Sequence, residues 1–245
     1  MKTIGIIGFG RFGKLVSKII SEQLPEFDLM VFSRQQRPPK NSGVLSFASK
    51  TAISKCDVII PCVSISAFKQ VVKELKNDIK PGCLFIDVCS VKIFPITVMK
   101  EFLPKNVNIV ASHPLFGPDS AKNGIKGLKI VLWNVRSKPK IFSKTKKILK
   151  KLGFKIIEMS PQEHDKLIAF SQVFTHLVCR MAERMDIKSG VIDTASFQQF
   201  LTLKQILIND NFELFLDMNK FNPFAVRMRK KFLQSFLKIE RSIHE

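Results

Sequence analysis

The sequence predicts a doubly wound α/β sheet of parallel strands, followed by an all-helical domain. Up to residue 159, short apolar runs typical of strands alternate with segments whose apolar residues have helical spacing. From Pro161 onward no strand signal recurs. We therefore place a boundary near Pro161, which divides the chain into residues 1–160 and residues 161–245.

Local patterns define the elements of the first part. The opening run holds three isoleucines before Gly8, as a buried strand does, and the segment after it has apolar residues on one helical face. Pro81 and Gly82 follow a second expected helix, and Gly153 ends a third. The expected strands are 2–8, 27–32, 57–63, 83–88, 107–111, 128–133 and 154–159, and the expected helices are 12–24, 67–75 and 140–152.

The second part is expected to be helical throughout, with helices at 164–185, 196–209, 212–219 and 224–244. Several faces of these helices are apolar, and so short a domain cannot bury them all by itself. We therefore expect a homodimer formed through the residues after Pro161.

Composition excludes several classes of protein. The chain of 245 residues has no apolar run of 18 residues, so no membrane helix is expected, and its start lacks the layout of a signal peptide. Its five cysteines are scattered without a C-x-x-C pair, which favours reduced thiols in a cytoplasmic protein and no metal site. The net charge of +20 is spread along the chain, so we expect it to attract small anions and do not expect nucleic-acid binding.

A glycine motif at the end of the first expected strand predicts a dinucleotide site of the Rossmann type. Its residues are Gly8, Phe9, Gly10, Arg11, Phe12 and Gly13. The first glycine permits a tight turn, the second lets the backbone approach a pyrophosphate, and the third lets helix and strand pack closely. The start of the helix then offers free N–H groups to the anion. A glycine-rich turn without a ligand is the alternative.

The end of the second expected strand favours NADP over NAD. NAD sites place an acid there to bind the ribose 2′-hydroxyl, whereas this chain has Ser33 and Arg34. A guanidinium can take the 2′-phosphate of NADP through a charge-assisted bond. Arg34 could equally be an ordinary surface arginine. Val63, at the end of the third expected strand, is assigned to the same site.

Polar residues follow two of the expected strands and recur in the helical part. Open α/β sheets bind ligands at the carboxyl ends of their strands. Gln172 and His176 are one turn apart on an expected helix and share a face, although any polar pair on a helix can do so. The three polar segments are Asp87 to Lys92, a loop containing His113 after the fifth strand, and Glu163 to His176.

The motifs in this order resemble the prephenate/arogenate dehydrogenase family, and most of all its plant-type arogenate branch. The resemblance covers nearly the whole chain. It rests on the glycine loop and on five further motifs: Asp87-x-x-Ser90-Val91-Lys92, Ser112-His113-Pro114-x-Phe116-Gly117-Pro118, Glu163-His164-Asp165-Lys166, Ser171-Gln172-x-x-Thr175-His176 and Asp210-x-Phe212-Glu213-Leu214-Phe215.

The resemblance implies an oxidative decarboxylation of a cyclohexadienol. In that reaction a base takes the ring hydroxyl proton while hydride passes to the nicotinamide, and loss of CO2 completes an aromatic ring. By resemblance His113 is the base, and Ser90 holds the same hydroxyl by a hydrogen bond. Gln172, His176 and Thr194 match positions that line the substrate pocket. His176 could instead be a packing residue between helices, and His164 could merely begin its helix.

Asp210 occupies the position where an acid accompanies use of arogenate and an amide accompanies use of prephenate. A carboxylate facing the ammonium group of arogenate is sound chemistry. The alternative is that Asp210 only caps the next helix. Similar bacterial enzymes bind the side-chain carboxylate with an arginine, and Lys204 is the nearest candidate here. The expected function is therefore NADP-dependent conversion of arogenate to tyrosine.

Three alternatives remain at this point: prephenate as the substrate, a related two-domain hydroxyacid or imine dehydrogenase, and a non-enzymatic protein that senses dinucleotides or binds nucleic acid. The hydroxyacid and imine enzymes share the glycine loop but use a catalytic lysine or a different pocket.

Overall fold

The computed structural model describes residues 2–34 and 46–244 of the chain. These residues form two compact units, one ending at Pro161 and the other beginning at Gln162. We call them unit 1 and unit 2.

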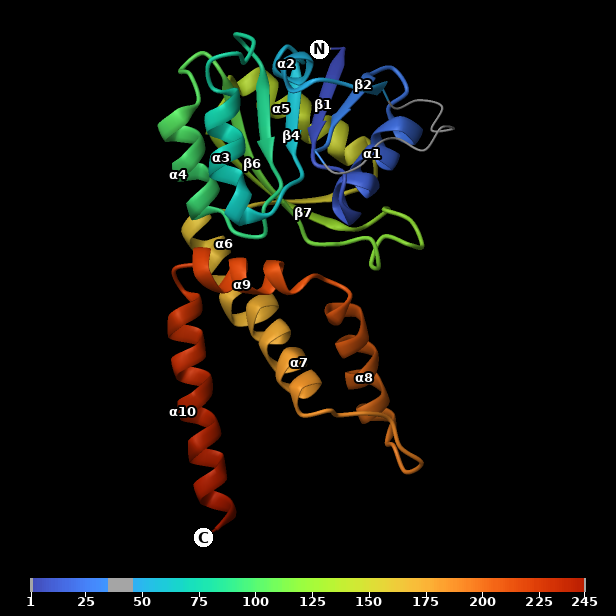
Figure 1. Cartoon of the computed structure of the whole chain (residues 1–245), viewed down its shortest axis with the longest axis vertical. Coiled ribbons are helices and arrows are strands. Elements are labelled where there is room, and N and C mark those ends of the chain that lie inside the picture. The colour runs from blue at the N-terminus through green and yellow to red at the C-terminus, as the bar shows by residue number, and fades with distance from the viewer. Residues whose placement is uncertain (1, 35–45, 245) are drawn as a thin grey trace. The chain divides into compact units, whose positions relative to one another are not determined.

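Unit 1 is a twisted sheet with helices on both faces (Figure 1). The central strands β1 and β4 lie side by side in parallel. In the described residues the strand order is β3-β2-β1-β4-β5-β6-β7-β8. Their bounds are β1 Thr3–Ile7, β2 Asp28–Phe32, β3 Ser46–Phe47, β4 Val58–Pro61, β5 Leu84–Asp87, β6 Asn108–Pro114, β7 Lys129–Arg136 and β8 Lys155–Glu158.

Strand β7 corrects the prediction of an all-parallel sheet, because it runs antiparallel to β6. A parallel pairing needs a crossover, usually a helix, and the segment 115–128 between these strands contains none. The chain therefore turns back beside β6, and β8 then pairs with β7 in parallel. A second correction concerns His113, which was expected in a loop. It lies within β6, in register with Val131.

The helices of unit 1 cover both faces of the sheet. The helices α3 and α4 pack side by side, while α1 and α5 line one apolar cavity of about 160 Å³ over the central strands. The middle of the core is formed by side chains of the central strands that are fully buried: Ile6, Ile59, Phe85 and Ile109. The helix bounds are α1 Arg11–Gln23, α2 Lys50–Ser54, α3 Ile65–Leu75, α4 Ile93–Phe102 and α5 Pro139–Lys151.

Three elements were not predicted from the sequence: β3, α2 and α4. The first two are very short. The helix α4 begins with a run rich in β-branched residues and holds Pro95 in its first turn, where a proline is tolerated because the N–H it lacks has no partner in a helix. Its sequence therefore carries weak helical signals.

Unit 2 is entirely helical in the residues described. Helices α7 and α8 lie side by side in opposite directions, and α9 and α10 pack on the turn between α6 and α7 (Figure 1). No helix of the described residues is long and apolar enough to cross a membrane. The bounds are α6 Pro161–Ile168, a π-helical turn Ala169–Val173, α7 Phe174–Arg184, α8 Ala195–Ile208, α9 Phe212–Phe221 and α10 Ala225–Ile243.

The π-helical turn interrupts what the sequence predicts as one helix over 164–185. The hydroxyl of Ser171 donates to the carbonyl of Leu167 at 2.8 Å, and that of Thr175 donates to the carbonyl of Ser171 at 2.8 Å. Gln172 lies in the π turn and His176 in α7, so the regular α-helical rotation assumed between them does not hold. Single π turns of this kind occur often at functional sites.

Candidate functional site

The glycine loop between β1 and α1 has the shape that a dinucleotide needs. Gly8 has a φ of +98°, and a Cβ there would lie 2.3 Å from the carbonyl oxygen of Cys62. A Cβ on Gly13 would lie 2.2 Å from the carbonyl oxygen of Gly8, so helix and strand meet too closely for any side chain. Around Gly10, by contrast, a Cβ would meet nothing within 4 Å. That open space at the start of α1 lets a phosphate approach the backbone N–H groups.

The other residues of this loop divide between core and surface. Phe9 is buried, with its ring 5.2 Å from that of Phe47, so it offers a ligand only its backbone. Phe12 is half-buried and Arg11 is exposed. Arg11 donates to the carboxylate of Asp119 at 2.8 Å, which ties the glycine loop to the segment after β6.

The end of β2 lies beside the glycine loop, because the N–H of Gly8 donates to the carbonyl of Phe32 at 2.8 Å. Ser33 is half-buried and Arg34 is exposed. Val63 follows β4 and lies close to Gly8, since its Cγ1 would be 3.2 Å from a Cβ there. The residues predicted for the adenosine side of the cofactor thus gather around one turn. The observed geometry fits a dinucleotide at this turn.

A buried ion pair holds the ends of β5 and β6 together. Asp87 is fully buried, and its carboxylate accepts from Lys92, from the N–H of Cys89 at 3.0 Å and from the N–H of Ser112 at 3.3 Å. Lys92 also donates to the carbonyl of Ser112. Burial raises the pKa of Asp87, and the Lys92 ammonium opposes that shift.

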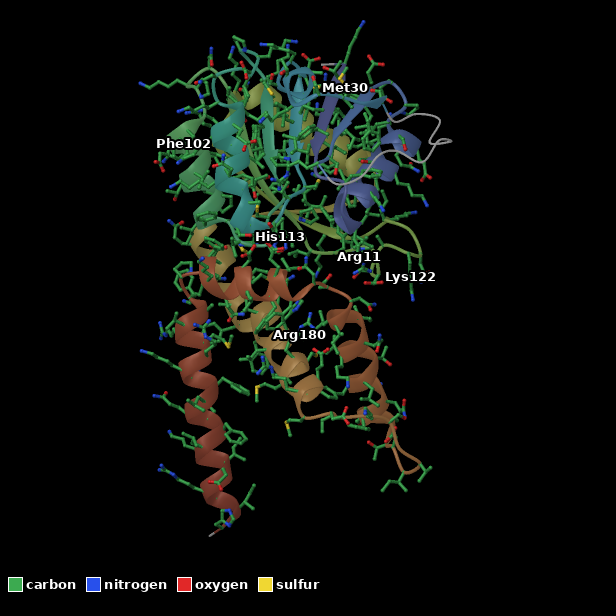
Figure 2. All side chains as sticks on the ribbon, viewed as in Figure 1. Arg11, Met30, Phe102, His113, Lys122 and Arg180 are labelled. Carbon is green, nitrogen blue, oxygen red and sulfur yellow. The ribbon has the colours of Figure 1, made fainter. Side chains whose placement is uncertain are left out.

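The two predicted catalytic residues flank this ion pair. Ser90 lies half-buried in the short segment that joins Asp87 to Lys92. His113 directly follows Ser112 and is 2% exposed. Because β5 and β6 are parallel neighbours, both residues lie at the same edge of the sheet as the glycine loop. Figure 2 shows His113 and Arg11 at that edge.

In unit 2, His176 lies in a buried polar cluster. It is 1% exposed, and neither of its ring nitrogens has a hydrogen-bond partner in the described part of the chain. Its Nε2 is 3.8 Å from Oδ2 of Asp210, which is beyond hydrogen-bond distance. Burial, and then the nearby charge of Arg180, lowers the pKa of His176 to about 4. The imidazole is therefore neutral near pH 7.

Asp210 does not cap the next helix, so that alternative is wrong. The N-cap of α9 is Asn211, whose side-chain oxygen accepts from the N–H of Leu214 at 2.8 Å. Both residue types are good caps, and their adjacency left the sequence ambiguous. The Asp210 side chain lies instead near His176, at a relative exposure of 31%.

Three other predicted residues lie in other parts of unit 2. Thr194 caps α8 by accepting from the N–H of Phe197 at 3.2 Å, and Lys204 donates to the carbonyl of Ile187. Gln172 is half-buried in the π turn. His164 is buried, with its Nδ1 2.8 Å from the carboxylate of Asp165, so it is part of the core of unit 2.

Arg180 is the residue of this cluster that the sequence analysis missed. It is 9% exposed and lies on α7 (Figure 2), one turn after His176. Its guanidinium donates to the backbone carbonyl of Asp210. The available signal was its spacing of four from His176 on one helix face. Nothing local in the sequence links it to a residue thirty positions later.

Comparisons with known proteins identify the family of this chain. Residues 35–158 match the family described as "Prephenate dehydrogenase, nucleotide-binding domain". The chain is 30% identical to "Arogenate dehydrogenase 2, chloroplastic" of Arabidopsis thaliana over 98% of its own length and 69% of that protein. It belongs to the prephenate/arogenate dehydrogenase family. The resemblance inferred from the motifs is thereby confirmed.

Other relatives of this family are longer than the chain. It is 33% identical to "Arogenate dehydrogenase 1, chloroplastic" of the same plant over 95% of its length, but it spans only 38% of that protein. A "Probable arogenate/prephenate dehydrogenase" of Methanocaldococcus jannaschii is 28% identical, and the chain spans 56% of it. Residues 181–245 also match the domain described as "TYRAAT1-like, C-terminal domain".

Solved structures confirm the predicted fold class of a Rossmann-type sheet followed by a helical domain, with a sheet that is mostly rather than wholly parallel. A prephenate dehydrogenase from Aquifex aeolicus, in complex with hydroxyphenyl propionate and NAD+, aligns with a TM-score of 0.78 at 16% identity and covers 99% of this chain and 91% of that one. An arogenate dehydrogenase from Synechocystis aligns with a TM-score of 0.71 at 18% identity, covering 99% and 92%. At such identities the likeness shows the fold alone.

Proposed function

We propose that this protein catalyses the NADP-dependent oxidative decarboxylation of arogenate to tyrosine. Membership of the family supports the reaction class. The choice of arogenate over prephenate rests on one observation, the carboxylate of Asp210 beside a neutral His176. The two substrates differ at one carbon, which carries an ammonium group in arogenate and a keto group in prephenate.

His113 and Ser90 act on the ring hydroxyl in this proposal. The imidazole of His113 takes the hydroxyl proton, and Ser90 orients the same oxygen by a hydrogen bond. Asp87 and Lys92 hold the backbone on either side of these residues, which keeps the base and the hydroxyl donor in register. A dinucleotide held at the glycine loop would supply the acceptor for the hydride that leaves the ring carbon bearing this hydroxyl. Departure of the ring carboxylate as CO2 then restores aromaticity.

Asp210 recognises the substrate's ammonium group. A protonated His176 would offset the charge of that carboxylate, and its low pKa prevents this near pH 7. The residues Gln172, Thr194 and Lys204 keep their proposed role in lining the substrate pocket. Lys204, however, already donates to a backbone carbonyl and is the weakest of these assignments.

A four-way assay tests the function. Arogenate or prephenate is combined with NADP or NAD, and the reduced cofactor is followed by absorbance. We expect the highest kcat/KM for arogenate with NADP. Asp210→Asn should lower the arogenate-to-prephenate ratio at least about tenfold, because a desolvated carboxylate–ammonium contact contributes about 1.5–3 kcal/mol. An unchanged ratio would remove the support for arogenate.

We further propose that the protein is a homodimer assembled through unit 2. The helix α10 exposes a row of large apolar side chains, with Leu233 57%, Phe236 53%, Ile239 61% and Ile243 74% exposed. A second copy would cover such a row. Light scattering at micromolar concentration should give twice the mass of the chain, and a monomer would contradict the proposal.

The cytoplasm remains the proposed compartment, on the composition argument alone. Two relatives carry the word "chloroplastic" in their names. Imaging of the tagged full-length protein in its own cells distinguishes the two locations.

A further inference from the structure

We propose that Arg180 is a positioning residue that holds Asp210 in place for recognition of the substrate's ammonium group. The inference rests on the proposed role of Asp210 and adds the residue that makes that role geometrically possible. Arg180 does not itself touch the substrate in this account.

The contacts of Arg180 converge on the segment between α8 and α9. Its Nη2 donates to the backbone carbonyl of Asp210, and its guanidinium carbon lies 5.6 Å from the centre of the Phe212 ring. Its Nη1 donates to Glu183 at 3.0 Å, one turn further along α7. The guanidinium thus joins α7 to the residues on both sides of Asn211.

Asn211 fixes the same segment from the other direction. By capping α9 it sets where that helix begins, and Arg180 sets the carbonyl one residue earlier. The Asp210 side chain leaves the Cα that directly precedes these two anchors, so they restrict its direction. Loss of the Arg180 contact would leave the cap intact but release the carbonyl of Asp210, which would let the backbone at Asp210 shift and move the carboxylate away from His176.

The burial of Arg180 indicates that this contact is maintained. A guanidinium that is 9% exposed is costly to bury unless acceptors surround it, and it has two, the Glu183 carboxylate and the Asp210 carbonyl. The Nε of Arg180 has no hydrogen-bond partner in the described part of the chain. Loss of the bond to the Asp210 carbonyl would therefore leave the guanidinium with still fewer hydrogen bonds. The same charge, next to His176, helps to keep that ring neutral.

The experiment compares four single variants of the full chain and the double variant that combines Arg180→Lys with Asp210→Asn. Arg180→Lys and Arg180→Met remove the guanidinium geometry. Arg184→Met is the matched control, because it removes an exposed arginine from the same helix. Asp210→Asn reports on the proposed function itself. For each we measure kcat and KM with arogenate and prephenate, and the melting temperature.

We expect Arg180→Met to lower the arogenate-to-prephenate ratio of kcat/KM about tenfold, mainly by raising KM for arogenate. Arg180→Lys keeps the positive charge and a hydrogen-bond donor, so it should fold even if the methionine variant does not. It should lower the arogenate-to-prephenate ratio less than Arg180→Met does. Arg184→Met should keep the ratio of the unmodified protein. In the Asp210→Asn background, Arg180→Lys should change the ratio no further.

The outcomes separate the two claims. If Asp210→Asn leaves the ratio unchanged, the proposed role of Asp210 is wrong and the inference is overturned with it. If Asp210→Asn lowers the ratio but Arg180→Lys does not, only the inference is overturned. An equal effect of Arg180→Lys with and without Asp210→Asn would also overturn it, because Arg180 would then act independently of Asp210.

Discussion

Two buried polar clusters, one in each unit, differ in how completely their hydrogen bonds are made. In unit 1, Asp87 and Lys92 are bonded to each other and to the backbone of Ser112. In unit 2, both ring nitrogens of His176 and the Nε of Arg180 lack partners in the described residues. Buried polar groups are nearly always paired, so an unpaired set needs an explanation.

The difference suggests a division of roles between the two clusters. A fully bonded buried pair fixes the backbone around it, here at the ends of β5 and β6. Under the proposed function, the unpaired atoms of the cluster in unit 2 belong to the site that receives the substrate. The predictions below test this contrast.

The largest effect is expected at His113, which the ion pair of unit 1 positions. His113→Asn should lower kcat roughly 100- to 10,000-fold, because general-base catalysis is lost. Cofactor affinity, measured by fluorescence titration, should stay nearly the same, since His113 lies outside the glycine loop. A variant that keeps more than about a tenth of the rate would show that His113 is not the base.

Breaking the ion pair should cost stability. Lys92→Met leaves the Asp87 carboxylate buried without its counter-charge, which should lower the free energy of unfolding by about 3–5 kcal/mol. Urea unfolding, monitored by circular dichroism, measures this loss of stability. The control is Asp87→Leu with Lys92→Met, which removes both charges and should cost less than the single change. A double variant as unstable as the single one would contradict the assignment of the loss to the unpaired charge.

The glycine loop and strand β7 of unit 1 show what can and what cannot be predicted from the sequence. The glycine loop is encoded locally, because Gly8 and Gly13 each meet a steric demand within one turn and Gly10 leaves open space between them. The direction of β7 depends on the length and conformation of the segment before it. No single residue of the segment 115–128 indicates that β7 runs antiparallel to β6.

The cluster in unit 2 was predicted only in part, for the same reason. The roles of His176 and Asp210 came from a resemblance, and the two residues, which lie close together, are on α7 and on the segment between α8 and α9, far apart in the chain. Asn211 and Asp210 are adjacent and cap helices equally well, so only the backbone decides between them. The π turn contains two hydroxyls that bond backward along the helix, but serine and threonine show the same pattern in regular helices, so the sequence does not mark the turn.

Acid should destabilise the cluster in unit 2 through His176. Its pKa is about 4 in the folded protein and near 6.5 in the unfolded chain, so the unfolded state binds the proton first. The contribution to stability is complete above pH 6.5 and is lost as the pH falls towards 4, with a total of roughly 3 kcal/mol.

The difference in unfolding free energy between the protein and His176→Gln, measured from pH 7 to pH 4, isolates this effect from the carboxylates. His244→Gln is the control, because that histidine is exposed. A pH dependence that is identical in the protein and in His176→Gln would show that His176 titrates normally.

The smallest expected effect concerns the cofactor, at a surface position of unit 1 that neither cluster touches. Ser33→Asp with Arg34→Ala should reverse or erase the preference for NADP, because the new carboxylate repels the 2′-phosphate and can instead accept from the 2′-hydroxyl of NAD. Loss of one charge-assisted contact of this kind changes affinity by roughly 1.5–3 kcal/mol, about tenfold or more.

The variant Arg34→Lys separates the effect of charge from that of geometry. If a point charge suffices, the variant should keep most of the preference for NADP. If the forked guanidinium is needed, the variant should lose much of that preference. The measurement is kcat/KM with each cofactor at saturating arogenate. Equal values for NADP and NAD in the unmodified protein would mean that Arg34 is an ordinary surface arginine, and the glycine loop would then bind either dinucleotide with no help from the end of β2.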